Sequence, residues 1–221
     1  MGASQGATSE LLFGERAPAG EAEGLLVLHH GRGSDEHELL RAADVLDPQR
    51  RLHVITPRGP LAPEGTSGRH WYLVDSPGHP DRASFGDSYA ALSELLEDRW
   101  RCTGIAPERT ILGGFSMGAV MSYTLGLGSG RPRPAGILAI SGFLPAIEGW
   151  QADLPARSGL PVLIAHGVRD PLIDVAHARD VRDRLLGAGL EVSYCESEVS
   201  HRIDPRLLAD AATWVSGALA R

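Results

Sequence analysis

Residues 111–120 read Ile-Leu-Gly-Gly-Phe-Ser-Met-Gly-Ala-Val, and this stretch predicts a change of backbone at its centre. Its first residues are typical of a buried strand, whereas those after the serine can pack as a helix. A sharp strand-to-helix turn would place Ser116 at its apex. Gly114 and Gly118 would flank the turn, where a Cβ atom would clash with neighbouring backbone. The amide of Met117, first in the predicted helix, would then point to where an oxyanion could form beside the serine.

The Gly-x-Ser-x-Gly pattern is not sufficient by itself. In a chain of 221 residues with 27 glycines, it would occur by chance in roughly one case in four. Its interpretation therefore depends on the strands and helices around it, and on whether suitable partners for Ser116 follow in the sequence.

The composition is that of an ordinary globular protein, with 43% hydrophobic and 22% charged residues. The length predicts one domain over residues 11–221, behind a flexible N-terminal tail of residues 1–10. No apolar run is long enough to cross a bilayer, so we expect no membrane insertion. The net charge of −7 argues against nucleic acid as a partner.

The N-terminal residues lack both the basic and the apolar region of a secretion signal, which predicts a cytoplasmic protein. Cys102 and Cys195 are the only cysteines. In a reducing compartment we expect them to be unpaired thiols rather than a disulfide.

Apolar runs and helical spacing alternate along the chain. Strands are predicted at about 11–14, 25–29, 52–56, 110–112, 135–140, 161–166 and 191–195, and helices at about 36–46, 84–101, 117–125, 175–186 and 205–218. Ser34 or Asp35 is the expected cap of the first helix. This alternation predicts an α/β fold with a mostly parallel central sheet and helices on both faces. The long segment 57–81, rich in Pro and Gly, is expected to be functional or mobile, but it is too short for a separate cap domain.

The partners of Ser116 can be sought at the carboxyl ends of the other strands. A serine hydroxyl needs a base to accept its proton, and that base needs a carboxylate to orient it. Asp170 lies four residues beyond the strand that ends at His166, and His201 follows the last strand, which completes the order Ser, Asp, His. Asp174 is the competing acid but is expected to cap the next helix. The alternative for His201 is an exposed loop histidine.

An oxyanion would need two hydrogen-bond donors, and backbone amides at two loops could supply them. Met117 N–H is one candidate. The loop at residues 30–33 offers amides next to glycines, with Arg32 N–H the best placed. Alternatively, these glycines only make the turn between a strand and a helix.

Metal-ligating side chains also cluster near the first buried strand: His29, His30, Asp35 and His37. Their spacing matches no known metal motif, and consecutive residues of a strand point to opposite faces. We therefore expect no metal and no cofactor.

Several motifs agree in order and context with one known family: Leu28-His29-His30-Gly31-Arg32-Gly33, Trp71-Tyr72, Gly114-Phe115-Ser116-Met117-Gly118, Ser141-Gly142, Asp170-Pro171 and His201-Arg202-Ile203. From about Leu25 to Val215, the chain resembles the phospholipase/carboxylesterase family of α/β-hydrolases. The resemblance implies an α/β-hydrolase fold, a catalytic triad of Ser116, Asp170 and His201, and an oxyanion hole from the amides of Arg32 and Met117. The chain departs from the family pattern at Met117, where Gln is common, and at Ser200, where Gly often precedes the histidine.

The function expected from these residues is hydrolysis of short-chain acyl or aryl esters through an acyl-enzyme. Residues expected to bind the substrate are Trp71, Tyr72, Leu73, Phe115, Phe143 and Ile173. In the alternative interpretation, Trp71 and Tyr72 only pack the long loop against the sheet. The nearest rival functions are an acyl-thioesterase or a lysophospholipase with the same triad, and a more distant one is a non-catalytic small-molecule-binding protein. The expected partner is a small-molecule ester, and the oligomeric state stays open, with a homodimer among the alternatives.

Overall fold

The computed structural model describes residues 11–76 and 79–220, so the tail predicted for residues 1–10 lies outside the described residues. The strands are β1 (Phe13–Arg16), β2 (Gly24–His29), β3 (Leu52–Pro57), β4 (Val74–Ser76), β5 (His79–Pro80), β6 (Thr110–Phe115), β7 (Gly136–Ile140), β8 (Pro161–Gly167) and β9 (Glu191–Ser197). The helices are α1 (Leu40–Leu46), α2 (Arg82–Thr103), α3 (Met117–Leu127), α4 (Val175–Gly187) and α5 (Pro205–Leu219), with short 3-10 helices at Pro107–Arg109 and Pro155–Arg157. Each strand and helix predicted from the sequence is present, with shifted ends.

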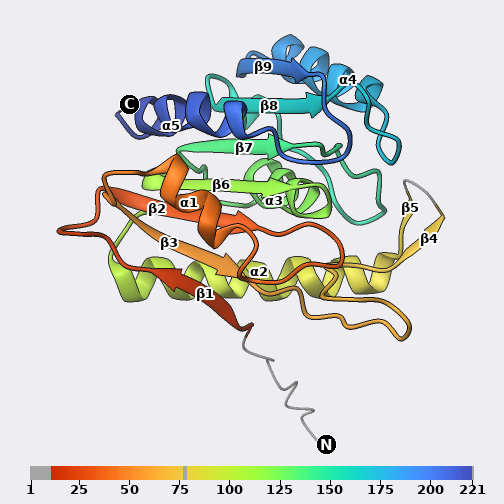
Figure 1. The fold of residues 1–221 in the computed structure, drawn as a ribbon, viewed down its shortest axis with the longest axis horizontal. Helices are drawn as coiled ribbons and strands as arrows, with labels where there is room; N and C mark the ends of the chain where they lie inside the picture. The colour runs from red at the N-terminus through yellow and green to blue at the C-terminus, as the bar shows by residue number, and fades with distance from the viewer. Residues whose placement is uncertain (1–10, 77–78, 221) are drawn as a thin grey trace, which may run out of the picture.

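Within residues 11–76 and 79–220, seven strands form one sheet in the order β1-β3-β2-β6-β7-β8-β9. Strand β1 is antiparallel to β3, and the other pairs are parallel. Every residue of β2, β6, β7 and β8 is buried, as their continuous apolar sequences require. The parallel strands therefore end on one side of the sheet, which is the right-hand side in Figure 1.

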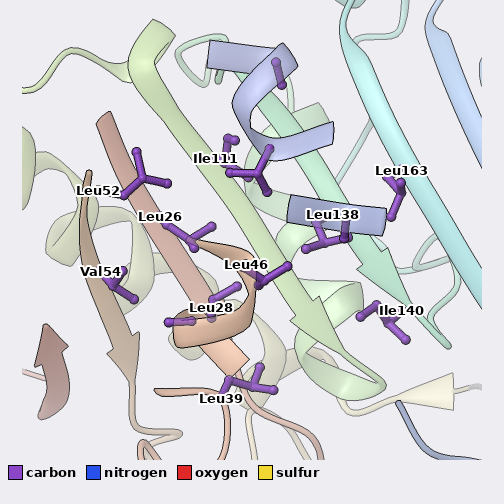
Figure 2. Packing of buried hydrophobic residues seen from close by; sticks show 14 of the residues in the cluster. Leu26, Leu28, Leu39, Leu46, Leu52, Val54, Ile111, Leu138, Ile140 and Leu163 are labelled. Carbon is purple, nitrogen blue, oxygen red and sulfur yellow. The ribbon is translucent and has the colours of Figure 1, made fainter. Parts of the chain in front are cut away.

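Helices cover both faces of the sheet, as predicted. Helices α1 and α5 pack on one face, in front of the sheet in Figure 1, whereas α2, α3 and α4 pack on the other. Figure 2 shows the first of these layers, where Leu26, Leu28 and Leu138 of the strands lie near Leu39 and Leu46. Burial of each such side chain contributes about 1.5–3 kcal/mol, so the sheet is fixed firmly beneath the loops at its carboxyl edge.

Helix α1 begins later than predicted, at Leu40, and its N-cap is Leu39 rather than Ser34 or Asp35. The side chain of Asp35 instead accepts a hydrogen bond from His37 N at 2.9 Å, within a turn that precedes the helix. The backbone of Ser34 is held by Arg69 N, which donates to Ser34 O at 2.6 Å. The local turn at Asp35 and the tertiary contact of Ser34 compete with helix formation, which explains the shorter helix.

Helix α2 begins at Arg82, two residues before Ser84; the sequence predicts a start at Ser84 or Asp87. Asp81 is its N-cap and accepts a hydrogen bond from Ser84 N at 2.8 Å. The helix ends at Thr103, and its C-cap Gly104 adopts a left-handed conformation with φ of 70°. None of the helices in the described parts of the chain combines the length and the apolar character needed to span a bilayer.

The long segment between β3 and α2 folds against the carboxyl edge of the sheet. It contains the two-stranded hairpin of β4 and β5, and isolated bridges join Leu61 to His70 and Ser34 to Arg69. Figure 1 shows the hairpin on the side to which the parallel strands point. This segment therefore contributes a wall to whatever site lies at that edge.

Candidate active site

Ser116 lies at the sharp turn between β6 and α3. Its backbone has φ of 56° and ψ of −120°, a combination that non-glycine residues rarely adopt. The strained conformation is held because Ser116 N donates to Ile140 O of the neighbouring strand at 2.8 Å. A Cβ atom on Gly118 would lie 2.0 Å from His29 O, and one on Gly114 would lie 2.5 Å from the backbone of Gly118. Both glycines are thus required by close backbone approach, as the sequence predicts.

The hydroxyl of Ser116 lies next to a histidine from the C-terminal part of the chain. Ser116 Oγ lies 2.8 Å from Nε2 of His201, in the loop between β9 and α5. The imidazole ring of His201 also packs against Phe115, with 4.9 Å between ring centroids. The histidine expected from the sequence is therefore in hydrogen-bonding distance of the serine, with an aromatic neighbour that limits its movement.

The other ring nitrogen of His201 faces Asp170, in the loop after β8. Nδ1 of His201 lies 2.6 Å from Asp170 Oδ2, and the Asp170 side chain is fully buried. Asp170 Oδ1 accepts hydrogen bonds from Leu172 N and Ile173 N, both at 2.9 Å. Burial alone would raise the pKa of Asp170, but the hydrogen bonds from Ile173, His201 and Leu172 outweigh it and lower the pKa. The carboxylate is therefore kept ionised and oriented toward His201.

Asp174, the competing acid, and the nearby His166 have other roles in this loop. Asp174 is the N-cap of α4 and accepts a hydrogen bond from Ala176 N at 2.8 Å, as expected for a capping residue. His166 is buried beneath the loop, with Nε2 2.8 Å from Ile173 O and 3.4 Å from Asp170 Oδ2. It thus supports the loop that carries Asp170.

Two residues of the pocket have backbone amides without a hydrogen-bond acceptor in the described part of the chain. Among the described residues, neither Arg32 N–H nor Met117 N–H donates a hydrogen bond. Met117 is the first residue of α3, where helical amides have no acceptor within the helix and the helix dipole favours negative charge. Both residues line the same pocket as Ser116. Both amides therefore leave a hydrogen-bond donor unused at the pocket.

The loop that presents Arg32 is fixed from several sides. Gly31 N donates to the carboxylate of Glu38 at 3.1 Å, and the ring of His30 donates from Nδ1 to Gly31 O at 2.7 Å. Gly33 N donates to Arg69 O at 2.9 Å. The amides of this loop are therefore preorganised, which an oxyanion site requires.

His29 and His30, considered above as metal ligands, are engaged inside the protein. Nδ1 of His29 lies 3.1 Å from Gly113 O and 2.9 Å from Ser122 Oγ, and complete burial lowers the pKa of His29 to about 3. His30 Nε2 accepts a hydrogen bond from Gly59 N at 2.9 Å, and burial lowers the pKa of His30 also. Both rings are therefore neutral structural groups that join β2 to its neighbours.

A pocket of about 510 Å³ opens beside Ser116 at the carboxyl edge of the sheet. Its walls are mostly apolar, and they include four residues predicted to bind substrate: Tyr72, Phe115, Phe143 and Ile173. Besides Ser116, the remaining lining residues are Gly31, Arg32, Glu38, Val74, His79, Pro80, Met117, Leu172 and His201. A pocket of this kind suits a small, largely apolar ligand.

Trp71 and Leu73 do not line this pocket. Trp71 is completely buried, its Nε1 donates to His30 O at 2.9 Å, and its ring packs against those of His29 and His30. Trp71 therefore has the alternative role, which is to pack the long loop against the sheet. Leu73 has 43% of its surface exposed and lies outside the lining, because successive residues of an extended segment point in opposite directions.

Sequence reasoning missed several pocket residues. Leu172 and Val74 could have been found, because they lie next to residues already assigned to the site. Glu38 gave no such signal, since it reaches the loop at Gly31 only because the chain before α1 forms a turn. The contact of Met117 was also missed: its sulfur accepts a hydrogen bond from Trp71 N at 3.3 Å.

The architecture is that of an α/β-hydrolase, with a serine at the strand-to-helix turn after the central strand. Residues 16–219 match the phospholipase/carboxylesterase family, and the chain belongs to that family. The expected α/β-hydrolase fold and family are thus confirmed.

Individual relatives agree with this assignment. The chain is 28% identical over 199 residues to the esterase YpfH of Escherichia coli, which covers 88% of this chain and 82% of the relative. It is 24% identical over 221 residues to acyl-protein thioesterase 1 of Debaryomyces hansenii, covering 92% and 94% of the two chains. The solved carboxylesterase of Bacillus cereus shares the fold, with a TM-score of 0.82 at 21% identity over 95% of each chain. The protein is a hydrolase of the carboxylesterase type.

Proposed function

We propose that this protein hydrolyses short-chain acyl or aryl esters through an acyl-enzyme formed on Ser116. The observation that carries the proposal is the chain of contacts from Ser116 Oγ to His201 Nε2 at 2.8 Å and from His201 Nδ1 to Asp170 Oδ2 at 2.6 Å. This is the arrangement in which a histidine activates a serine while a carboxylate fixes the tautomer of the histidine.

In the acylation step, His201 Nε2 accepts the hydroxyl proton as Ser116 Oγ attacks the ester carbonyl carbon. The carbonyl oxygen becomes an oxyanion and accepts hydrogen bonds from the amides of Arg32 and Met117. The bond from carbon to the leaving oxygen then breaks, and His201 gives its proton to the departing alcohol. Asp170 stays ionised throughout and stabilises the charged imidazolium.

In the deacylation step, water takes the place of the alcohol. His201 accepts a proton from the water molecule, whose oxygen attacks the acyl carbon. Collapse of the second intermediate releases the carboxylic acid and returns the proton to Ser116 Oγ. All the groups that move protons belong to the protein or the substrate, so the proposed mechanism needs no cofactor.

The pocket supports a small ester as the substrate. Its volume of about 510 Å³ and its aromatic walls at Phe115 and Phe143 suit a short acyl or aryl group. Burial of apolar surface there contributes about 25 cal/mol per Å², enough to hold such a group beside Ser116 without a charged anchor.

Burst kinetics with p-nitrophenyl acetate would test the acyl-enzyme. We expect a rapid release of about one equivalent of p-nitrophenolate per enzyme, followed by slower turnover. Ser116→Ala should abolish the burst. If that variant retained the burst, Ser116 would not be the nucleophile.

An acyl-thioesterase or lysophospholipase acting on longer chains is the second candidate. It is favoured by exposed apolar residues at and near the pocket mouth: Leu73, Val74 and Leu172, which are 43%, 37% and 73% exposed. Comparing turnover of short aryl esters, thioesters and lysolipids would separate the two functions. A preference for the short aryl esters would support the first candidate.

We further propose that the protein acts in the cytoplasm. Cys102 and Cys195 are both free thiols, as expected from the sequence. Unpaired cysteines are typical of proteins in a reducing compartment. Cell fractionation would test the location.

A further inference from the structure

Tyr72 lines the pocket together with apolar residues, and its side chain carries a hydroxyl group. Only 3% of its surface is exposed, whereas the charged pocket residues Arg32 and Glu38 are exposed at the rim. Phe115, Phe143 and Ile173 supply apolar surface to the same pocket. A polar group in such surroundings fixes the orientation of a ligand more strongly than one in water.

The backbone on both sides of Tyr72 is tied to helix α2. Ser88 Oγ donates a hydrogen bond to Trp71 O, and Leu73 N donates to Ser84 Oγ at 3.0 Å. The ring of Tyr72 packs against Phe85 of the same helix, with 5.3 Å between centroids. Tyr72 is therefore held in place before any ligand binds, so that little entropy is lost on binding.

The hydroxyl of Tyr72 has no hydrogen-bond partner in the part of the chain that the structure describes. The Tyr72 oxygen also does not belong to the completely buried side-chain atoms that lack a partner. It therefore reaches the accessible surface, and the surface that Tyr72 lines is the pocket. Burial raises the pKa of the phenol above its ordinary value, so the group is an O–H donor at neutral pH. Buried tyrosine hydroxyls normally find an acceptor.

We infer that Tyr72 Oη–H donates a hydrogen bond to an uncharged oxygen of the substrate, outside the reacting ester group. The inference rests on the proposed function and narrows it to esters that carry an ether or carbonyl oxygen in their non-reacting part. The oxygen must be uncharged, because a carboxylate placed among Phe115, Phe143 and Ile173 would lose its hydration for a single hydrogen bond.

The test compares Tyr72→Phe with the wild type on pairs of esters of equal size. One pair places an ether oxygen in the acyl chain: p-nitrophenyl 3-methoxypropanoate against p-nitrophenyl pentanoate. The other places it in the alcohol: 2-methoxyethyl butanoate against butyl butanoate. In at least one pair, we expect Tyr72→Phe to lower kcat/KM of the ether ester about 5- to 10-fold and that of the alkyl ester less than 2-fold. Because each alkyl ester reports on the same variant, damage to folding would lower both values together.

Tyr89→Phe is the matched control. Tyr89 lies in α2, the helix against which Tyr72 packs, but it does not line the pocket. Tyr89→Phe should leave all four kcat/KM values unchanged. An equal effect of Tyr72→Phe on both members of each pair, or no effect on either pair, would overturn the role of Tyr72 while the proposed esterase function stood. If the wild type cleaved none of the esters, the proposed function itself would fail, and the role of Tyr72 with it.

Discussion

The sulfur of Met117 accepts a hydrogen bond from the backbone nitrogen of Trp71, at a distance of 3.3 Å. Met117 begins the helix that follows Ser116, and Trp71 lies in the long segment between β3 and α2. The contact therefore fastens the segment that carries Tyr72, a pocket residue, to the turn that carries the serine. It also gives a physical role to the methionine that replaces the glutamine common in the family, because both side chains can accept a hydrogen bond.

Replacing Met117 by leucine should measure this contact. Met117→Leu keeps the volume but leaves Trp71 N–H buried without an acceptor, which costs about 1–3 kcal/mol. Met121→Leu is the control, since Met121 is completely buried in the same helix and makes no such hydrogen bond. Urea unfolding should show a larger loss of stability for Met117→Leu, and Met117→Gln should retain more of it. Equal losses at positions 117 and 121 would show that the sulfur contributes packing alone.

Asp170→Asn should lower kcat by roughly 1,000- to 10,000-fold, because an amide no longer fixes the tautomer of His201 or stabilises its charged form. Asp174→Asn is the matched control in the same loop. Asp174 caps α4, and asparagine is an equally good cap, so activity and stability should both stay close to wild type. Turnover of p-nitrophenyl butanoate by the two variants would measure the difference. An Asp170→Asn enzyme within tenfold of wild type would contradict the role given to this carboxylate.

His29 should make the protein less stable in mild acid. Its folded-state pKa is about 3, below the ordinary value of 6.5, so between these pH values the unfolded chain binds a proton that the folded chain does not. Stability is therefore lost as the pH falls from 6.5 toward 3, at up to about 1.4 kcal/mol per pH unit from this group. His29→Asn retains a donor toward Gly113 O but removes the titration. Unfolding measured between pH 4.5 and 7 should have a shallower slope in this variant, and parallel curves would refute the assignment.

Gly118→Ala should disrupt the turn at Ser116, because the added Cβ would lie 2.0 Å from His29 O and 2.5 Å from His30 O. Separating α3 from β2 should cost roughly 2–3 kcal/mol and reduce activity. Gly86→Ala is the control, since Gly86 is also helical and a Cβ there meets nothing within 4 Å. That change should stabilise the protein by about 0.5–1 kcal/mol. Thermal unfolding would compare them, and a neutral Gly118→Ala would contradict the close approach.

Much of the site could be predicted because it depends on the order of strands. Ser116 and Asp170 each follow a strand with a buried, mostly apolar sequence, whereas His201 follows a strand of alternating character. Parallel strands bring their carboxyl ends to one edge. The structure puts these side chains within hydrogen-bonding distance of one another.

Contacts made by the long loop could not be predicted in the same way. Trp71 and Tyr72 are adjacent and both aromatic, yet Trp71 is buried against His30 whereas Tyr72 faces the pocket. Which side each residue faces depends on tertiary bridges such as Leu61 with His70. No local periodicity encodes such bridges. The contact of Glu38 with Gly31 could not be predicted for the same reason, because it depends on the late start of α1.

The central claim is that His201 and Asp170 activate Ser116 as a nucleophile. Labelling with a fluorophosphonate probe tests it most directly, because the probe reacts with an activated serine and not with an ordinary hydroxyl. We expect wild type to be labelled at one site, Ser116→Ala not to be labelled, and His201→Ala to be labelled far more slowly. Absence of labelling in the wild type, or equal labelling after Ser116→Ala, would contradict the account.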